Sequence, residues 1–390
     1  MIADRKWVKD NLGFDPVTQP LPATTYEYKP AHSSASPEDL AREIIDFDSD
    51  SVAGQQFLMS TTSTGLTQRF TDIPWPKGLD PKTDSKARTG EKGALPKADV
   101  LVVTWTVDEG HALSRVLTPG KDSRNDYLPY KHNYATISKK MRKGCPAVEA
   151  KRLGAYWTTK IGDKRVVVFK SDSHLSQDTK TLPPKGGTLP NEDVWKQIID
   201  EVQPKLVITT GTAGGIGKQF EVGDVVVSPI VRFDCQRWLD NKQYPYLNAH
   251  FQDSAPSPTL FAKAQTLFKA NSDQLPKGNT RPPKIFRVPL GKLSQSVVTT
   301  DFFGFDTSNN RYKLWHQGDV SEMGDAILGL VISRMETKPQ WVAVRNVSDP
   351  QIKAVGTIKE QGKLAASIYK GFGRWSSVCS GIVCWAIIAA

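Results

Sequence analysis

The sequence predicts an α/β fold, because short buried strands alternate with helices along most of the chain. The expected strands are apolar runs rich in Val and Ile, at residues 98–105, 165–171, 205–211, 224–231, 294–300 and 341–348. Continuous β-branched runs of this length are typical of strands that are covered on both faces. Helical patterns at 190–203, 319–337 and 361–388 supply that cover, so we expect a layered α/β domain.

The first 97 residues differ in composition, because prolines interrupt a polar sequence rich in Ser, Thr and Lys. Only residues 37–47 show a helical period there, with Ser36 placed to cap the helix. We therefore expect a polar, Pro-rich extension over 1–97 and one domain over 98–390. Long polar tracts near 121–145 and 235–290 are interpreted as insertions into that domain, and 261–270 as a helix within the second.

Composition excludes several classes of protein. The chain has 390 residues, 38% of them apolar and 24% charged, which fits neither a membrane channel nor a uniformly disordered chain. Four cysteines show no zinc-ligand spacing, and the N-terminus lacks the apolar core of a secretion signal, so we expect a reduced, cytoplasmic protein. The apolar run 376–390 is too short to span a bilayer, and we expect a buried helix and no membrane partner.

The sharpest motif is LVITTGTAGGIG at 206–217, followed by VGDVVV at 222–227. A strand that runs into small residues exposes backbone N–H groups and lets a ligand approach the main chain. A dinucleotide-binding loop is excluded because the glycines lead into another strand instead of a helix. A P-loop is excluded because no Gly-Lys-Ser/Thr follows.

This motif resembles the signature of the purine nucleoside phosphorylase and nucleosidase superfamily. Segments 102–113, 298–303, 319–326 and 341–350 agree with the same family in the expected order, so the resemblance covers about 98–390. It implies a three-layer fold with a central mixed β-sheet flanked by helices. It also implies a homo-oligomer, in which a neighbouring subunit closes the pocket.

The resemblance implies a catalytic role for Glu109, which follows the first strand of the domain. In nucleosidases of this superfamily a Glu at this place activates the attacking water, and Asp108 is the alternative. An acidic residue here also suits a helix N-terminus, so a capping role stays open.

Asp349 is the expected general acid, because in purine-cleaving members the Asp of a Ser-Asp pair protonates the leaving purine. A carboxyl in a closed apolar site can have its pKa raised enough to donate a proton at neutral pH. Asp349 precedes Pro350, so a simple turn residue is the other interpretation.

Substrate contacts follow from the same resemblance. Phe303 matches the aromatic residue that stacks on the purine, with core packing as the other interpretation. Gly324 stands where the family has the second Glu of its ribose clamp, so Glu322 or Asp325 is left to bind the sugar hydroxyls. The expected substrate-binding residues are Thr212, Ala213, Gly214, Asp301, Phe303, Glu322, Met323 and Asp325.

These residues together predict hydrolysis of the N-glycosidic bond of a purine nucleoside or nucleotide, with adenine as the expected base. No metal or cofactor is expected, and His111 and His174 are interpreted as ordinary polar residues. Two alternatives remain. Arg115 and Arg345 keep a phosphate-dependent phosphorylase open, although the acidic pair 108–109 repels phosphate, and Gly324 keeps open a catalytically weakened nucleotide-sensing module.

The net charge of +10 directs attention to an anionic substrate. Basic tracts 121–143 and 277–287, with Arg232, are candidates to bind a 5′-phosphate, and solvated loops are the other interpretation. Nucleic acid is not an expected partner, because the chain has no RNP-like aromatic pair, zinc finger or basic heptad region.

Overall fold

The computed structural model describes most of the chain. The described residues are 1–18, 73–84, 93–123, 125–143, 145–175, 180, 188–235, 246, 249–254, 259–268, 275–301 and 303–390.

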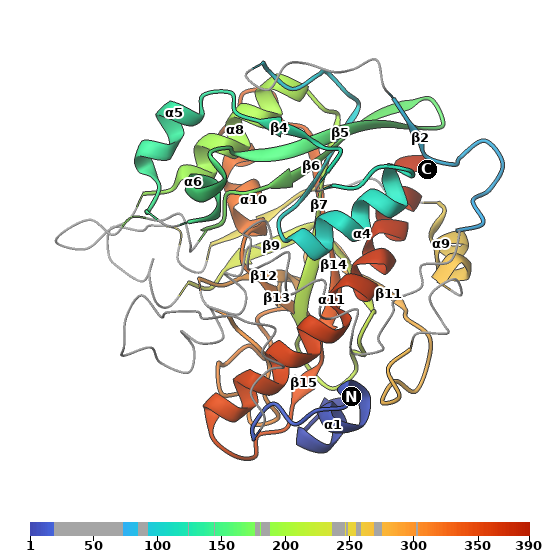
Figure 1. Ribbon diagram of the computed structural model, residues 1–390, viewed down its shortest axis with the longest axis vertical. Coiled ribbons are helices and arrows are strands. Elements are labelled where there is room, and N and C mark those ends of the chain that lie inside the picture. The colour runs from blue at the N-terminus through green and yellow to red at the C-terminus, as the bar shows by residue number, and fades with distance from the viewer. Residues whose placement is uncertain are drawn as a thin grey trace.

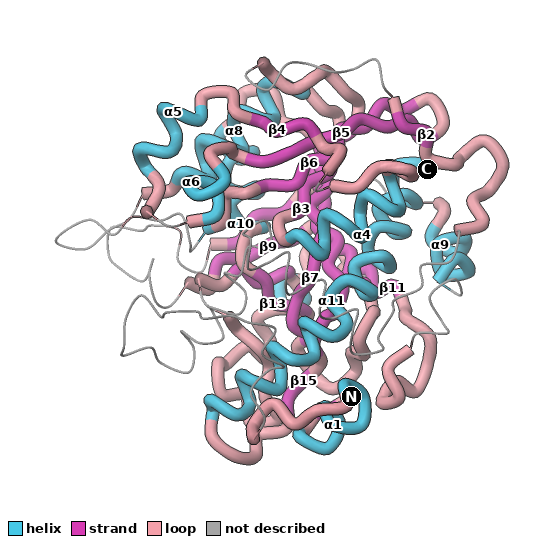
Figure 2. The backbone as a smooth tube through the Cα atoms, in the orientation of Figure 1, coloured by secondary structure: helices cyan, strands magenta, loops and turns pink. Residues whose placement is uncertain are grey.

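A mixed β-sheet forms the centre of the described structure, with thirteen strands among the described residues. Its middle is parallel, since β6, β3, β7 and β14 lie side by side in one direction, while β5, β8 and β13 run antiparallel to their neighbours in it. Figure 2 shows these strands crossing the molecule. They are β2 (Lys82–Thr83), β3 (Val100–Thr104), β4 (Leu128–Tyr130), β5 (Gly154–Ile161), β6 (Lys164–Ser171), β7 (Leu206–Gly215), β8 (Val225–Ser228), β9 (Ile230–Phe233), β10 (His250–Gln252), β11 (Ile285–Arg287), β12 (Val297–Thr299), β13 (Val320–Glu322) and β14 (Gln340–Asp349).

Helices cover both faces of this sheet, as Figure 1 shows. The described α-helices are α1 (Arg5–Leu12), α4 (Val107–Leu117), α5 (Tyr134–Ile137), α6 (Pro146–Ala150), α8 (Pro190–Val202), α9 (Phe261–Leu267), α10 (Asp325–Arg334) and α11 (Ile358–Ala389). Alternation along β3 divides the core, because Leu101 packs with the α8 and α10 side and Val102 with the α4 and α11 side. The predicted α/β fold with a mixed sheet between helical layers is confirmed.

Helix α11 is the longest described helix and lies against the centre of the sheet. It is long and apolar enough to cross a bilayer, but 89% of its most apolar window is buried inside the protein, as in a core helix. Asn346 of β14 fixes its position, since its amide donates to Ser376 over 2.7 Å and accepts from Ser380 over 2.8 Å. This buried polar link sets the register of α11 over β14.

The secondary structure differs from the prediction in several details. The run 224–231 is two strands, because Pro229 separates β8 from β9 and the two pair with different neighbours. The predicted helix 319–337 begins as strand β13, and α10 starts only after Gly324. Strand β5 was not predicted, because its polar and aromatic residues lack a β-branched apolar run.

The described parts of the 1–97 segment pack on the α/β domain. Strand β1 (Ile2–Ala3) pairs in parallel with β15 (Gln351–Ile352), and Trp7 of α1 contacts Phe372 edge-on at 6.1 Å between ring centroids. Further on, β2 pairs with β5, and the ring centroids of Trp75 and Trp385 lie 4.7 Å apart. The predicted helix 37–47 falls outside the described residues.

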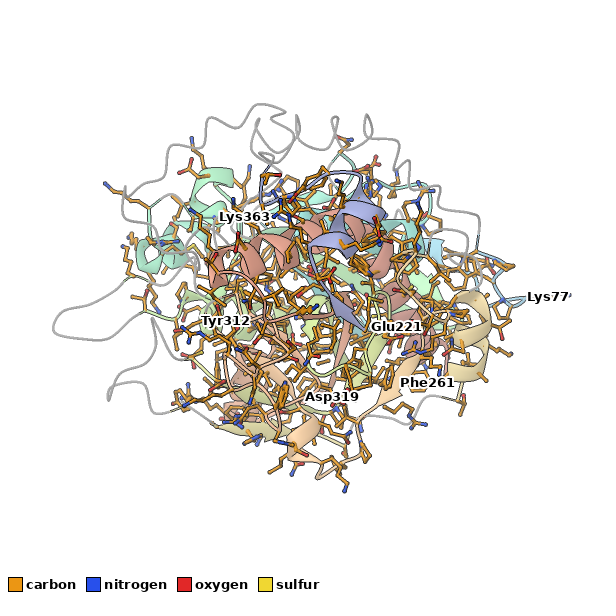
Figure 3. The ribbon with its side chains drawn as sticks, turned by 90° about the horizontal axis from the view of Figure 1, so that it is seen from below. Lys77, Glu221, Phe261, Tyr312, Asp319 and Lys363 are labelled. Carbon is orange, nitrogen blue, oxygen red and sulfur yellow. The ribbon has the colours of Figure 1, made fainter. Side chains whose placement is uncertain are left out.

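The two tracts that we interpreted as insertions add strands to the sheet where they are described. Strand β4 of the first tract pairs with β5, and β10 and β11 of the second pair with β9 and β8. The predicted helix in the second tract is present as α9. Figure 3 labels Phe261 of this helix together with Tyr312 and Asp319, which lie between β12 and β13 in the sequence.

Candidate active site

A cavity of about 80 Å³ lies at the carboxyl ends of the parallel strands β3, β7 and β14, where ligands bind in open α/β sheets. The start of α4, the segments that follow β6 and β12, the turn between β13 and α10, and one residue of α11 also contribute to its walls. The cavity is lined by Trp105, Thr106, Glu109, His174, Thr212, Ala213, Gly214, Thr300, Phe303, Gly304, Ser321, Glu322, Met323, Gly324, Arg345, Ser348, Asp349 and Tyr369.

Glu109 is held at the N-terminus of α4 by a capping box with Thr106. One carboxylate oxygen, Oε2, accepts hydrogen bonds from the Thr104 hydroxyl and from the backbone N–H groups of Trp105 and Thr106, over 2.9, 3.1 and 2.9 Å. Oε1 accepts from the backbone and hydroxyl of Thr212 over 2.8 and 2.6 Å. The residue is therefore both a helix cap and part of the cavity wall, so the two interpretations of Glu109 are compatible.

The surroundings of Glu109 keep its carboxylate ionised. Burial acts to raise the pKa of Glu109, but the charge of Arg345 and the hydrogen bonds from Thr212 and Thr106 outweigh burial and lower it below the usual carboxyl value. Gly211 makes this arrangement possible, because a Cβ there would lie 2.7 Å from the carboxylate. With both oxygens accepting hydrogen bonds, Glu109 is an anion with little free basicity.

Arg345 places a buried cation beside this anion. Its guanidinium binds both oxygens of Asp325, with 2.8 Å between Nε and Oδ2, and lies 3.2 Å from Glu322. Its Cζ also lies 4.7 Å from the ring centroid of Trp105. The opposing charges of Asp325 and Glu322 outweigh burial and raise the pKa of Arg345, so the guanidinium stays charged. Asp325 is therefore occupied by Arg345 and does not line the cavity, contrary to our expectation for it.

Asp349 ends β14 in an environment opposite to that of Glu109. It is buried, its Oδ1 accepts from the Ser348 hydroxyl over 3.0 Å, and its Oδ2 has no hydrogen-bond partner among the described residues. Burial raises the pKa of Asp349 to about 7, against a small lowering by Ser348. Gly214 keeps the space beside this carboxyl open, since a Cβ there would lie 3.1 Å from Oδ2. Asp349 is thus a protonated or readily protonated acid that faces the cavity.

The structure brings most of the predicted site residues to the cavity. Those that line it are Glu109, Thr212, Ala213, Gly214, Phe303, Glu322, Met323 and Asp349. Asp301 does not, because it is buried beyond the end of β12, where after burial itself it is the largest cause of the raised pKa of the Cys235 thiol. Phe303 packs against Phe305, with ring centroids 5.7 Å apart, and Phe302 lies outside the described residues.

Sequence reasoning did not assign several residues of the lining to the site, among them Trp105, His174 and Tyr369. Trp105 lies directly before the cap of α4, and Tyr369 comes from the middle of a helix whose apolar pattern indicates only burial. His174 was interpreted as an ordinary polar residue, yet it lines the cavity, where burial and the nearby Lys170 lower its pKa to about 4. His174 is therefore neutral at physiological pH. Nearness to a predicted strand end was the available signal for Trp105 and His174.

Residues 128–367, more than half of the chain, match the family model of the phosphorylase superfamily. The chain belongs to this superfamily. The resemblance inferred from the 206–217 motif is thereby confirmed. The matched residues include the whole cavity lining except Trp105, Thr106, Glu109 and Tyr369.

Known proteins similar to this superfamily member include nucleosidases. A 5′-methylthioadenosine/S-adenosylhomocysteine nucleosidase of Listeria innocua is 26% identical over 135 residues, which are 33% of this chain and 51% of the relative. The chain thus matches about half the length of that relative. Among solved structures, the nucleosidase of the same name from Neisseria meningitidis has a TM-score of 0.43 at 18% identity, with 75% of this chain and 99% of that chain covered. Futalosine hydrolase of Helicobacter pylori has a TM-score of 0.43 at 12% identity, with 74% and 96% covered.

Removal of the buried guanidinium should strongly destabilise this superfamily member. In Arg345→Met, Asp325 and Glu322 are left as buried carboxyls without their counter-ion, which costs about 3–5 kcal/mol of the free energy of unfolding. Urea denaturation followed by circular dichroism measures it.

The matched control is Arg334→Met, which removes a pair with Glu192 whose side chains are 46% and 27% exposed. This variant should lose less than about 1 kcal/mol. Equal losses in the two variants would show that the buried pair does not stabilise the site.

Proposed function

We propose that this protein hydrolyses the N-glycosidic bond of a purine nucleoside, releasing adenine and the free sugar. The observation that carries the proposal is Asp349, a buried carboxyl with a raised pKa and an unpartnered oxygen at the end of β14. A purine anion is a poor leaving group until it is protonated, and an acid of this kind can supply the proton at neutral pH.

Glu109 complements Asp349 in the same cavity. As the purine leaves, positive charge develops on the sugar, and a fixed anion beside C1′ stabilises that charge. Because the lowered pKa of Glu109 keeps it ionised, this electrostatic role suits it better than strong basicity does. The water that attacks C1′ then needs no strong base, because it releases its proton to solvent only after the glycosidic bond has largely broken. Solvent returns a proton to Asp349 at the end of the cycle.

The charges of the lining support water over phosphate as the nucleophile. The lining contains the carboxyls of Glu109, Glu322 and Asp349, and its one guanidinium among the described residues, Arg345, is already bound to Asp325. A phosphate ion would meet the ionised carboxylate of Glu109 and a guanidinium that Asp325 already neutralises. Arg115, which we had considered for phosphate, does not line the cavity.

The described parts of the basic tracts support a substrate without a 5′-phosphate. None of their residues lines the cavity, and several are paired elsewhere. Arg281 binds both oxygens of Asp224, and Lys140 donates to Asp193 over 2.7 Å. The net charge of the chain therefore gives no reason to expect a nucleotide, and the adenine nucleosides named for the Listeria relative are the better substrate class.

The first experiment measures base release from adenosine, methylthioadenosine, inosine and AMP by chromatography, with and without phosphate. We expect free adenine from the neutral adenine nucleosides at a rate that phosphate does not change. Strict dependence on phosphate would make the protein a phosphorylase. Tight binding without any base release would instead favour a sensing module.

Asp349→Asn should reduce kcat for adenine release by about 10²–10⁴, because an amide cannot donate the proton that the leaving purine needs. The matched control is Asp319→Asn. Asp319 is also a carboxyl whose pKa burial raises to about 7, but it does not line the cavity, so its variant should keep the wild-type rate. Undiminished release by Asp349→Asn would remove the acid from the mechanism.

The pH dependence of kcat/KM should follow the two carboxyls in opposite directions. The reaction needs Asp349 protonated, and its raised pKa of about 7 means that activity is lost as pH rises through 7, by about tenfold per unit. It needs Glu109 ionised, and the lowered pKa of Glu109 places the acid limb below the pH at which an ordinary Glu carboxyl titrates. A rate that increases between pH 7 and 9 would contradict this assignment.

A further inference from the structure

The wall of the cavity at the start of α10 is an indole ring. Trp105 packs over Gly324, so that a Cβ on this glycine would lie 3.1 Å from Cζ2 of the ring. The same ring contacts Arg345 on one side and Trp195 edge-on at 6.1 Å. Trp105 is only 8% exposed and is thus fixed from several directions.

The carboxyl group of Glu322, which lies beside this wall, accepts hydrogen bonds from the protein on both oxygens. Oε2 of Glu322 accepts from the backbone N–H of Gly324 over 2.6 Å and lies beside Arg345. Its Oε1 accepts from the Thr299 hydroxyl and from the backbone N–H of Asp325. Glu322 therefore caps α10 and neutralises a guanidinium, and it has no oxygen left to accept from a ligand.

Three hydroxyl groups of the lining also donate within the protein. Thr212 donates to Glu109, and Ser321 donates to the backbone carbonyl of Gly304. Ser348 donates to the Asp349 carboxyl that follows it. Among the carboxyl oxygens of the described lining, Oδ2 of Asp349 is the one that accepts no hydrogen bond.

These contacts decide what the cavity can recognise in a sugar. A nucleoside that places its purine at Asp349 and its C1′ near Glu109 sets its sugar against Trp105, Met323 and Gly324. This surface offers shape and apolar contact, and it offers no unoccupied carboxylate. A sugar hydroxyl on this side can therefore make no charged hydrogen bond to an unoccupied carboxylate, and a hydroxyl that is buried without a partner weakens binding.

We propose that the cavity takes purine nucleosides whose sugar lacks the 2′- or the 3′-hydroxyl, and that it uses such deoxynucleosides at least as well as ribonucleosides. The inference rests on the proposed hydrolysis and names the substrate class within it. Trp105 and Gly324 are then the residues that determine sugar specificity.

The test compares kcat/KM for adenosine, 2′-deoxyadenosine and 3′-deoxyadenosine with the full-length protein. Without a carboxylate clamp, both deoxynucleosides should equal adenosine within about threefold or exceed it. A charged hydrogen bond to a sugar hydroxyl would instead favour adenosine by about tenfold or more over both analogues, and that result would overturn the proposal.

A designed acceptor provides the second arm. In Trp105→Ala/Gly324→Gln, removal of the ring leaves room for an amide oxygen that can accept from a sugar hydroxyl without adding charge beside Glu322. This variant should gain a preference for adenosine of about threefold or more. The control is Trp105→Ala alone, which should show no such gain. If the ratio of kcat/KM for adenosine over the deoxynucleosides is equal in the two variants, the sugar does not lie against Trp105 and Gly324, and the proposal is contradicted.

A binding measurement separates this proposal from the proposed function. Dissociation constants of the three nucleosides are measured by calorimetry on Asp349→Asn, which does not need turnover. Equal affinities without base release by the wild-type protein would overturn the hydrolysis and keep the specificity. Base release by the wild-type protein with a tenfold preference for adenosine would keep the hydrolysis and overturn the specificity. Failure to bind any of the three nucleosides would overturn both.

Discussion

The guanidinium of Arg345 is the interaction on which the site depends. It stands within β14 and is buried, so its charge must be balanced inside the protein, and Asp325 and Glu322 supply the balance from the start of α10. Those bonds fix where α10 begins. The same charge lowers the pKa of Glu109 at the start of α4, so one cation couples two helices to the central strands.

The parts of this arrangement that the sequence predicted are those with local signals. The β-branched run of β14 ends in Ser348 and Asp349, and the small residues that end β7 leave space beside them, so both strand ends could be placed before their contacts were known. Glu109 was assigned a role because it follows the first strand of the domain at the place where, by resemblance, nucleosidases of the superfamily have a Glu. In the structure, parallel neighbours bring these strand ends to one edge of the sheet.

Residues whose role depends on long-range packing could not be predicted in this way. Tyr369 reaches the cavity only because the link from Asn346 to Ser376 sets the position of α11, and a helical period carries no information on that register. Asp325 looked like a free carboxylate beside a glycine, and only the fold shows that Arg345, twenty residues later, binds it. The described parts of the first 97 residues pack through isolated aromatic side chains such as Trp75, which a mostly polar composition conceals.

The departure at Gly324 shows why a motif has to be interpreted with its surroundings. Taken alone, a glycine in place of a side chain suggests a lost contact and a weakened site. In the structure the vacated space belongs to Trp105, which comes from a different element and also packs on Arg345. The Trp105 ring packs against both Gly324 and the guanidinium of Arg345. A larger or smaller side chain at any one of these positions alone therefore creates either a clash or a gap. The three positions therefore act as one unit, and they form a packed wall of the cavity. If the family's second Glu had simply been lost, an empty space would remain beside Gly324.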